Sequence, residues 1–310
     1  MLKDRFSLFS KPTIFSLVLT SVLLIPAQLF SVSNASAATS YPITVKSGGY
    51  VTTIKTKPIK IISLSPTATE ILFGIGAGPQ VLAVDDQSNF PIEAPKSALS
   101  GFDPNIEAIV AQKPDMVILS VDSTKSKVAK ESLTKLGIPV IMEKAAARVN
   151  DAYSEIEILG LATGNLPAAK ALVKKMKSDI SLILRTSSKS PKLRFFHELD
   201  ETLYSATSKT FIGSVYKDFG LKNVADAANG ADKSGYPQIT AEYLIKSNPQ
   251  IIFLADGYAS QNAQTVKNRA GWSQIEAVKK NRIVVLPQDI PSRWGPRIVD
   301  FYRVVAETIK

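Results

Sequence analysis

The sequence predicts an α/β fold with two similar lobes, each built on a parallel β-sheet, and one long helix between them. Short β-branched runs alternate with helical segments from Pro58 onward. Several segments of the first half recur in the second half in the same order. A long amphipathic stretch, residues 165–184, separates the halves and predicts the connecting helix.

Residues 1–37 have the pattern of a secretory signal peptide. Basic residues precede an apolar stretch from Ile14 to Phe30, and residues 35–37 (Ala-Ser-Ala) supply a cleavage pattern. A membrane anchor is the alternative, but Pro26 disfavours it. Because the chain has no cysteine, a lipid-modified cysteine is excluded. We therefore expect an exported, soluble protein, periplasmic or extracellular and not a lipoprotein.

Composition narrows the classes of function. Of 310 residues, 45% are hydrophobic and 21% charged, which suffices for a packed core. The absence of cysteine excludes disulfide scaffolds, thiolate metal sites and a cysteine nucleophile, and the single histidine, His197, excludes multi-imidazole sites. The formal net charge is +10, but the lysines are dispersed. We expect a monomer that binds no nucleic acid; an anionic ligand is compatible with the charge.

After the signal peptide, the patterns divide the chain into an extension, two lobes and a linker. The extension alternates around Gly48-Gly49, which indicates an irregular strand or a hairpin. The expected parts are the extension (38–57), the N-terminal lobe (58–150), the linker with the long helix (151–188) and the C-terminal lobe (189–310).

The N-terminal lobe opens with a strand followed by a helix. Ile59–Leu64 is a β-branched run, and Ser65 and Pro66 suit the N-cap and first position of a helix. Thr67–Glu70 also fits a capping box. The helix is expected to end at the glycines before the next strand, Val81–Val84.

The two lobes repeat one pattern. Residues 105–119 align without a gap with residues 240–254, and each stretch is a short helix, a proline break and a buried strand. Chance similarity between such units is the alternative, but the matched Glu107 and Glu242 favour repetition. Two further pairs of segments resemble each other and occur in the same order in the two halves. They are residues 73–81 with 219–224, and residues 136–141 with 281–286.

Motifs for catalysis are mostly absent. The glycines of residues 74–78 follow a helix and precede a strand, so they indicate a helix-ending turn rather than a dinucleotide-binding loop. The sequence has neither a phosphate-binding loop nor a nucleophile elbow. His197 could serve an acid or a nucleophile, but a structural or ligand-lining histidine is the favoured interpretation. We predict no catalytic residue and no metal site.

Polar and aromatic residues collect where the predicted strands end. Because open α/β sheets bind ligands at the carboxyl ends of their strands, these residues indicate a cleft for a partly planar ligand. Ordinary loop polarity is the alternative. The residues are Asp85–Phe90, Phe102, Glu198, Asp200, Glu201, Tyr204, Tyr236, Asp289, Arg293 and Trp294.

Three ordered segments resemble the binding proteins of bacterial ABC importers for iron–siderophores, heme and cobalamin. They are Ile61–Glu70 (IISLSPTATE), Asn105–Ile109 (NIEAI) and Lys113–Ile118 (KPDMVI), and the resemblance extends over residues 55–310. It implies two Rossmann-like lobes joined by one long helix, the class III arrangement. It also implies delivery of a captured ligand to a membrane permease driven by a cytoplasmic ATPase.

The resemblance implies that Glu107 and Glu242, one on each lobe, dock into arginine pockets of the permease. The helix dipole alone favours a carboxylate early in a helix, which explains one such glutamate. Equivalent glutamates in both lobes fit a two-point dock better.

The cobalamin-binding members look most similar. Their C-terminal lobe carries an Asp and an Arg four residues apart before a Pro-Arg, a spacing matched by Asp289, Arg293 and Pro296-Arg297. Tyr236, before Pro-Gln, resembles their ligand-facing Trp. The expected ligand-binding residues are Gln87, Phe102, Tyr204, Tyr236, Asp289, Arg293 and Trp294.

The sequence also departs from the cobalamin-binding pattern. Gln87 replaces an aromatic residue, and Phe102 stands where a Trp is expected. A different corrinoid, heme or a ferric siderophore therefore stays open as the ligand. Heme would need an axial ligand, for which the candidates are Tyr236, Tyr204 and His197.

The leading hypothesis is a solute-binding protein for a cobalamin-like or iron-chelate ligand, without a cofactor of its own. An exported enzyme that uses His197 is a second hypothesis. A module that binds a cell-wall or surface partner is the third.

Overall fold

The computed structural model describes residues 39–121, 123–187, 192–228, 234–257, 261–287 and 289–310. The predicted signal peptide, residues 1–37, lies outside the described residues. From residue 39 onward, the described residues form one compact unit. The boundaries proposed for the extension, lobes and linker stay predictions.

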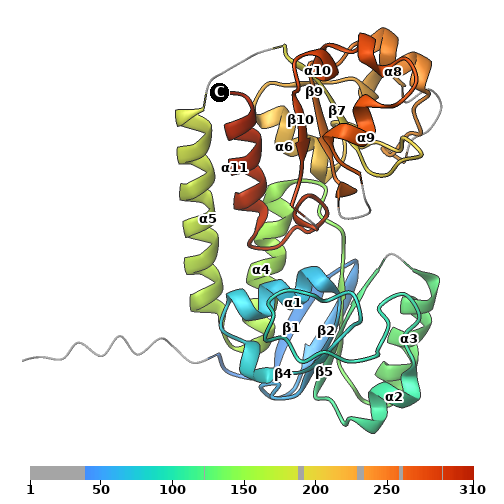
Figure 1. Ribbon diagram of the computed structural model, residues 1–310. Helices are drawn as coiled ribbons and strands as arrows, with labels where there is room; N and C mark the ends of the chain where they lie inside the picture. Colours follow the sequence, from blue (N-terminus) through green and yellow to red (C-terminus); the bar gives the residue numbers. More distant parts are fainter. Residues whose placement is uncertain (1–38, 122, 188–191, 229–233, 258–260, 288) are drawn as a thin grey trace, which may run out of the picture. The chain divides into compact units, whose positions relative to one another are not determined.

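Two parallel four-stranded sheets organise the described residues (Figure 1). The N-terminal sheet has the order β4-β3-β5-β6 and consists of β3 (Ile61–Leu64), β4 (Val81–Val84), β5 (Met116–Ser120) and β6 (Val140–Glu143). The C-terminal sheet has the order β8-β7-β9-β10 and consists of β7 (Arg194–Glu198), β8 (Lys222–Asn223), β9 (Ile251–Leu254) and β10 (Ile283–Val285). When the four strands of each lobe are numbered in chain order, both sheets have the same spatial order: second, first, third, fourth. The repetition that the aligned segments predict is therefore confirmed.

Helices connect the strands in both lobes. The N-terminal lobe contains α1 (Pro66–Gly74), α2 (Ile106–Ala111) and α3 (Thr124–Lys135). The C-terminal lobe contains α6 (Phe211–Asp218), α7 (Ala225–Ala228), α8 (Ala241–Ser247), α9 (Ala263–Lys267), α10 (Glu276–Lys279) and α11 (Ile298–Thr308). Strands that alternate with helices in this way require parallel pairing, as the sequence pattern indicates.

Helix α1 begins as the sequence predicts, but its glutamate has another role. The Ser65 hydroxyl accepts a hydrogen bond from the Ala68 backbone N–H at 3.3 Å, and Pro66 occupies the first helical turn. The capping-box interpretation of Thr67–Glu70 is wrong. The Glu70 carboxylate is buried and pairs with arginines from the end of the chain.

Two long helices stand between the lobes. Helix α4 (Val149–Thr163) is followed by α5 (Leu166–Thr186), which confirms the helix expected over residues 165–184. The two helices pack tightly on each other, and α5 also packs on α11 (Figure 1). A Cβ at Gly160 would lie 2.3 Å from the Ala169 Cβ, so this close helix contact requires glycine.

Residues 43–54 form a hairpin that covers the open edge of the N-terminal sheet. Strands β1 (Ile43–Ser47) and β2 (Tyr50–Ile54) pair antiparallel around Gly48-Gly49. The Ser47 hydroxyl donates to the Met142 carbonyl at 2.8 Å, and the Thr52 hydroxyl donates to the Val140 carbonyl at 2.6 Å. Both carbonyls belong to β6, which pairs with no further strand on this side among the described residues. Side-chain hydroxyls therefore supply hydrogen bonds to the backbone of this edge strand.

One hydrophobic cluster runs through both lobes. It contains Ile61 and Met116 from the N-terminal sheet, Val173 from α5, Phe253 from the C-terminal sheet and Val305 from α11. The opposite face of each sheet packs in a separate cluster of its own lobe. Both faces of both sheets are therefore covered, which explains why the strands are continuous apolar runs.

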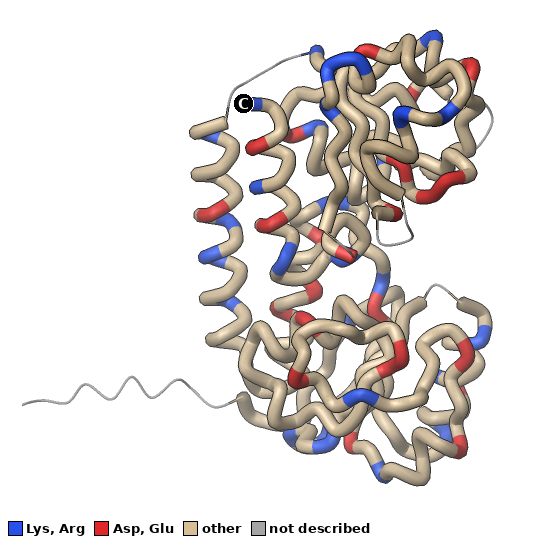
Figure 2. The backbone as a smooth tube through the Cα atoms, in the orientation of Figure 1, with Lys and Arg blue, Asp and Glu red and all other residues tan. Residues whose placement is uncertain are grey.

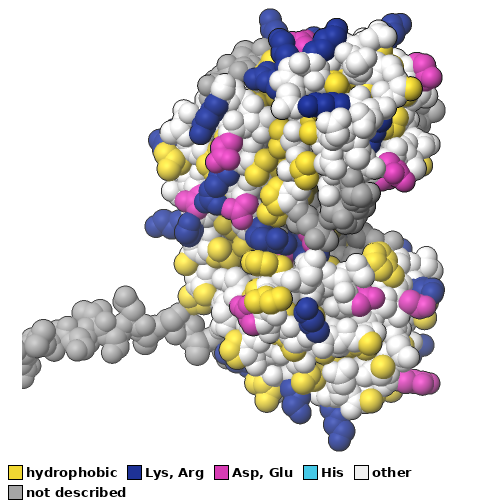
Figure 3. All heavy atoms as spheres, in the orientation of Figure 1, with side chains coloured by type: hydrophobic (Ala, Val, Ile, Leu, Met, Phe, Trp, Pro, Cys, Tyr) yellow, Lys and Arg dark blue, Asp and Glu magenta, His cyan; other side chains and the backbone are white. Residues whose placement is uncertain are grey.

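The surface of the described residues carries dispersed charge. Figures 2 and 3 show Lys and Arg over many elements rather than in one continuous patch. This dispersion agrees with a solvated exterior.

Glu155 on α4 gives a testable pH dependence of stability. Burial raises the pKa of Glu155 to about 7, and the Ser47 hydroxyl is its hydrogen-bond donor, 3.2 and 3.3 Å from the two carboxylate oxygens. Since the folded-state pKa exceeds the unfolded value, this group lowers the free energy of unfolding as pH rises from about 4.5 to about 7. We expect Glu155→Gln to stabilise the protein by about 3 kcal/mol at pH 8 and negligibly at pH 4.

Urea unfolding at the two pH values measures this difference. Glu157→Gln, the same change at a half-buried position of α4, is the control. An equal effect of Glu155→Gln at both pH values would show that ionisation of Glu155 does not matter.

Candidate functional site

A cavity of about 310 Å³ lies at the carboxyl ends of β3, β4 and β5. The segment between β10 and α11 forms its other wall. A larger cavity of about 450 Å³ lies beside β2, at the amino ends of β5 and β6. Because open parallel sheets bind ligands at the carboxyl ends of their strands, we take the 310 Å³ cavity as the candidate site. Its lining is Leu64–Thr67, Asp85, Gln87, Gly101, Phe102, Ser120, Ser123, Ser126, Asp289 and Ser292–Trp294.

Part of the residue set expected from the sequence meets at this cavity. The residues that line it are Gln87, Phe102, Asp289, Arg293 and Trp294. That they bind a ligand stays a prediction. The other expected residues, Tyr204 and Tyr236, lie on adjacent loops of the C-terminal lobe and not in the lining. Both are about two-fifths exposed (42% and 41%).

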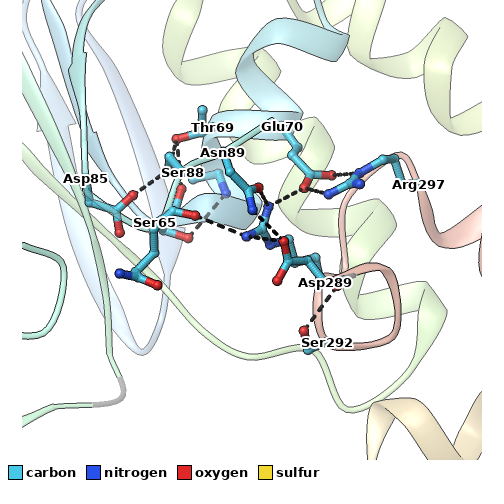
Figure 4. A network of polar contacts seen from close by, with 12 residues as sticks. Ser65, Thr69, Glu70, Asp85, Ser88, Asn89, Asp289, Ser292 and Arg297 are labelled. Atoms are coloured by element: carbon cyan, nitrogen blue, oxygen red, sulfur yellow. Dashed lines mark hydrogen bonds and ion pairs between the residues drawn. The ribbon is translucent and has the colours of Figure 1, made fainter. Parts of the chain in front are cut away.

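A buried ionic network ties the N-terminal lobe to the segment before α11 (Figure 4). The Glu70 carboxylate accepts a hydrogen bond from Arg293 Nη1 at 3.0 Å and from Arg297 Nε at 2.9 Å. Arg297 Nη2 donates to the same carboxylate, which gives the paired geometry of a guanidinium fork. Glu70 is 3% exposed, so both arginines pair with an almost fully buried carboxylate.

Arg293 has little hydrogen-bonding capacity left for a ligand. Besides Glu70, its Nη1 donates to Asn89 Oδ1 at 2.7 Å, and its Nη2 lies 3.1 Å from the Gln87 carbonyl and 3.0 Å from Asp289 Oδ2. Of the five N–H donors of the guanidinium, three form hydrogen bonds, and Nη2 also makes the ion pair with Asp289. Arg293 therefore shapes the wall of the cavity, and its charge is balanced by carboxylates.

Trp294 joins the same wall to the end of β6. Its indole N–H donates to Glu143 Oε1 at 2.8 Å, and the Ser65 hydroxyl donates to the other oxygen of this buried carboxylate. The Trp294 ring also meets Phe211 of α6 edge-on, with 6.4 Å between ring centroids. Trp294 thus contacts both lobes.

Asp85 places a buried carboxyl in the cavity lining. Burial raises the pKa of Asp85 to about 6, although the hydrogen bond from the Ser88 hydroxyl opposes the shift. The neighbouring loop approaches closely, because a Cβ at Gly101 would lie 2.8 Å from both Asp85 Oδ2 and the Leu64 carbonyl. Glycine at position 101 avoids these contacts, and its neighbour Phe102 belongs to the cavity lining and is 74% exposed.

His197 is not part of the site. It is fully buried in β7, with Nδ1 2.8 Å from the Tyr216 hydroxyl, and Nε2 has no partner among the described residues. Burial lowers the pKa of His197 to about 3, so the imidazole is neutral. The full burial of His197 disfavours both alternatives that gave it a role, as a heme ligand or as a catalytic base.

Comparison with known proteins bears on what this cavity serves. Residues 61–290 match the periplasmic binding protein family. The chain belongs to this family. The fold and the resemblance to binding proteins of ABC importers are thereby confirmed.

Relatives place the family membership in context. An uncharacterised ABC transporter substrate-binding lipoprotein of Bacillus subtilis is 34% identical over 277 residues, which is 87% of this chain and 86% of that protein. A cobalamin-binding protein of Halobacterium salinarum is 26% identical over 278 residues, 86% of this chain and 74% of that protein. A solved structure of a possible iron-binding (periplasmic solute-binding) protein from Staphylococcus epidermidis has a TM-score of 0.71 at 27% identity, covering 82% of this chain and 99% of that one.

These relatives are substrate-binding proteins rather than enzymes. The Bacillus relative is named a lipoprotein, whereas the present sequence contains no cysteine. Across the described residues, no helix has the length and apolar character needed to cross a membrane.

The two glutamates that the family resemblance singles out occupy equivalent places. Glu107 and Glu242 are both exposed, in the first turns of α2 and α8, after the N-caps Asn105 and Thr240. Neither carboxylate has an ion pair with another described residue. The two positions therefore present equivalent, unneutralised carboxylates on the two lobes.

The C-terminal lobe has a second set of carboxylates at its strand ends. Arg269 forms two 2.6 Å hydrogen bonds to Glu198, which is fully buried at the end of β7. Asp256 follows β9 and is 4% exposed, and its carboxylate oxygens have no hydrogen-bond partner among the described residues. Burial raises the pKa of Asp256, and Arg269 opposes the shift.

Some of these residues were missed at the level of sequence. Glu70 and Glu143 were not expected to shape the site, whereas Asn89 belongs to the Asp85–Phe90 stretch that was expected at the cleft. Glu143 carried one available signal, because an acidic residue that ends a buried apolar strand at the ligand-binding edge needs a partner there.

Proposed function

We propose that this protein captures a cobalamin-like corrinoid between its lobes and delivers it unchanged to an ABC permease. The observation that carries the proposal is the cavity at the carboxyl ends of the N-terminal strands, which brings together residues expected to bind such a ligand. Phe102 and Trp294 offer aromatic surface to a planar ring. Gln87, Asp289 and the serine hydroxyls offer partners for peripheral amides.

The cavity is suited to one edge of a large ligand. At about 310 Å³ it lies at the low end of small-molecule pockets, and a corrinoid extends beyond it. We expect Tyr204 and Tyr236 of the C-terminal lobe to cover the exposed part by stacking. The cobalamin-binding relative supports this choice of ligand.

Titration of the purified protein against cyanocobalamin, hemin and a ferric siderophore tests the proposal. We expect saturable binding of the corrinoid. We also expect Phe102→Ala to weaken that binding about tenfold, because a stacked aromatic ring is lost from a position without a packing role.

Ile92→Ala is the matched control, since Ile92 is 78% exposed and lies outside the cavity lining. Equal affinities for Phe102→Ala and the parent protein would remove Phe102 from the site. Binding of none of the three ligand types would refute the proposed function.

A ferric siderophore or heme is the alternative ligand within the family. The similarity to a possible iron-binding protein favours it. With His197 buried, the phenols of Tyr204 and Tyr236 are the candidates for an axial heme ligand. A Soret band that is lost in Tyr204→Phe or Tyr236→Phe would support heme over a corrinoid.

Release depends on docking, for which we propose Glu107 and Glu242. Carboxylates exposed on both lobes can pair with arginines at two points of a permease, and this fixes the orientation of the complex. We further propose that the protein acts as an exported monomer, cleaved near residue 37 and without a lipid anchor. The mass of the mature N-terminus and size-exclusion chromatography test these two points.

A further inference from the structure

Although charge is dispersed over the surface as a whole, the charged residues that flank the strands are sorted by sign among the described residues. Basic residues gather where strands begin: Lys60, Lys113, Lys192, Arg194, Lys222, Lys280 and Arg282, with Asp115 as the acidic exception. Acidic residues gather where strands end: Asp85, Asp86, Glu143, Glu198, Asp200, Glu201, Asp226 and Asp256, with Lys144 as the basic exception. In Figure 2 the C-terminal sheet shows blue at the end where its strands begin. In a chain of net charge +10, the carboxyl ends of the strands are thus an acidic edge, in which Glu198 is paired with Arg269.

The cavity itself adds no free positive charge. Arg293 is the cation of its lining, and Glu70 and Asp289 already pair with it at 3.0 Å each. Asp85 in the same lining forms no ion pair with another described residue; its side-chain donor is Ser88, and Arg293 acts on it only through the electrostatic field. Charge in the lining is therefore balanced or negative.

Helix N-termini do not reverse this balance. Ser65 and Ser123, which cap α1 and α3, both line the cavity, and helix N-termini generally favour anions. However, each serine oxygen accepts a hydrogen bond from its own helix, from Ala68 N at 3.3 Å and from Ser126 N at 2.9 Å. Each cap thus occupies one of the first backbone N–H groups of its helix, and Pro66 removes another from α1, which reduces the number of donors open to an anionic ligand.

We propose that the site selects its ligand by charge: it accepts a neutral or cationic chelate or corrinoid and rejects polyanionic ones. The inference rests on the proposed function and narrows its ligand class. Acidic clefts repel anions through a field that acts over several ångströms and weakens with added salt. Heme with two free carboxylates and ferric triscatecholates belong to the rejected class.

Matched pairs of probes test charge apart from shape. Each pair shares a scaffold or a metal and differs in charge: cyanocobalamin with its monocarboxylic acid, hemin dimethyl ester with hemin, and a ferric trihydroxamate with a ferric triscatecholate. Within the pair that binds, we expect the more anionic member to bind about tenfold weaker, or more, at low ionic strength. We expect this difference in affinity to become smaller in 0.5 M salt, a concentration at which the screening length is roughly 4–5 Å.

Variants locate the source of the selection. Asp86→Asn combined with Glu201→Gln removes two exposed charges at strand ends. We expect this change to reduce the difference in affinity between the two members of a probe pair about threefold. Glu131→Gln combined with Glu307→Gln removes two exposed charges elsewhere, on helices. We expect this change to leave the difference in affinity unchanged. Equal or tighter binding of the anionic member in low salt overturns the inference and leaves the proposed function standing. Binding of no member of any pair overturns the proposed function, and the inference with it.

Discussion

Glu70→Ala is expected to lower the free energy of unfolding by about 3–5 kcal/mol. The substitution leaves Arg293 and Arg297, which are 8% and 18% exposed at the side chain, with their shared buried carboxylate removed. Breaking a buried ion pair by removing one partner costs far more than the pair itself contributes, because the remaining charge stays desolvated. Urea unfolding at pH 7 measures the change.

Glu93→Ala is the control for Glu70→Ala. Glu93 is exposed and lines a small neighbouring cavity together with Glu70 and Arg297. We expect its replacement to change the stability by less than about 0.5 kcal/mol. A loss below about 1 kcal/mol for Glu70→Ala would mean that water or another carboxylate compensates the two arginines.

The combined variant Glu107→Ala, Glu242→Ala is expected to reduce ligand uptake by about a hundredfold or more while ligand affinity stays unchanged. Close charge pairs across an interface couple by roughly 1.5–7 kcal/mol, and under the proposed docking this variant would remove two such pairs. Each change also removes a favourable helix-dipole contact, a cost of roughly 0.3–1 kcal/mol that leaves the fold intact. Uptake by cells that produce the variant, with binding by the purified protein, measures the two effects separately.

Single variants sharpen the docking test. If both lobes dock, Glu107→Ala and Glu242→Ala should each lower uptake, whereas Glu131→Ala on the exposed face of α3 should not. Uptake at the parent level in the combined variant would show that the permease recognises another surface.

The sequence predicts the scaffold well because the signals for it are local. Continuous β-branched runs mark strands that are buried on both faces, and proline and glycine mark where the helices stop. Glu107 and Glu242 occupy the same place in two aligned segments, so the repetition of the sheets could be inferred without coordinates. The long helix follows from the spacing of its apolar residues.

The site was harder to predict because its contacts are remote. Glu70 pairs with residues 223 and 227 positions away, and locally it fits a helix cap. The sequence placed Arg293 near the cavity, but only the folded structure shows that most of its contacts are already made within the protein. His197 lies in an apolar strand with both faces covered, and its position gives no local sign of which face the ring occupies.

The single apolar cluster that links Ile61, Val173 and Phe253 has a consequence for engineering. Although the two halves repeat one topology, they share a single hydrophobic cluster. They are therefore not interchangeable modules. A chimera that takes one half from a relative must also inherit the matching side chains of α4, α5 and α11. To change the ligand preference, substitution of residues in the loops at the strand ends is therefore a better strategy than exchange of whole halves.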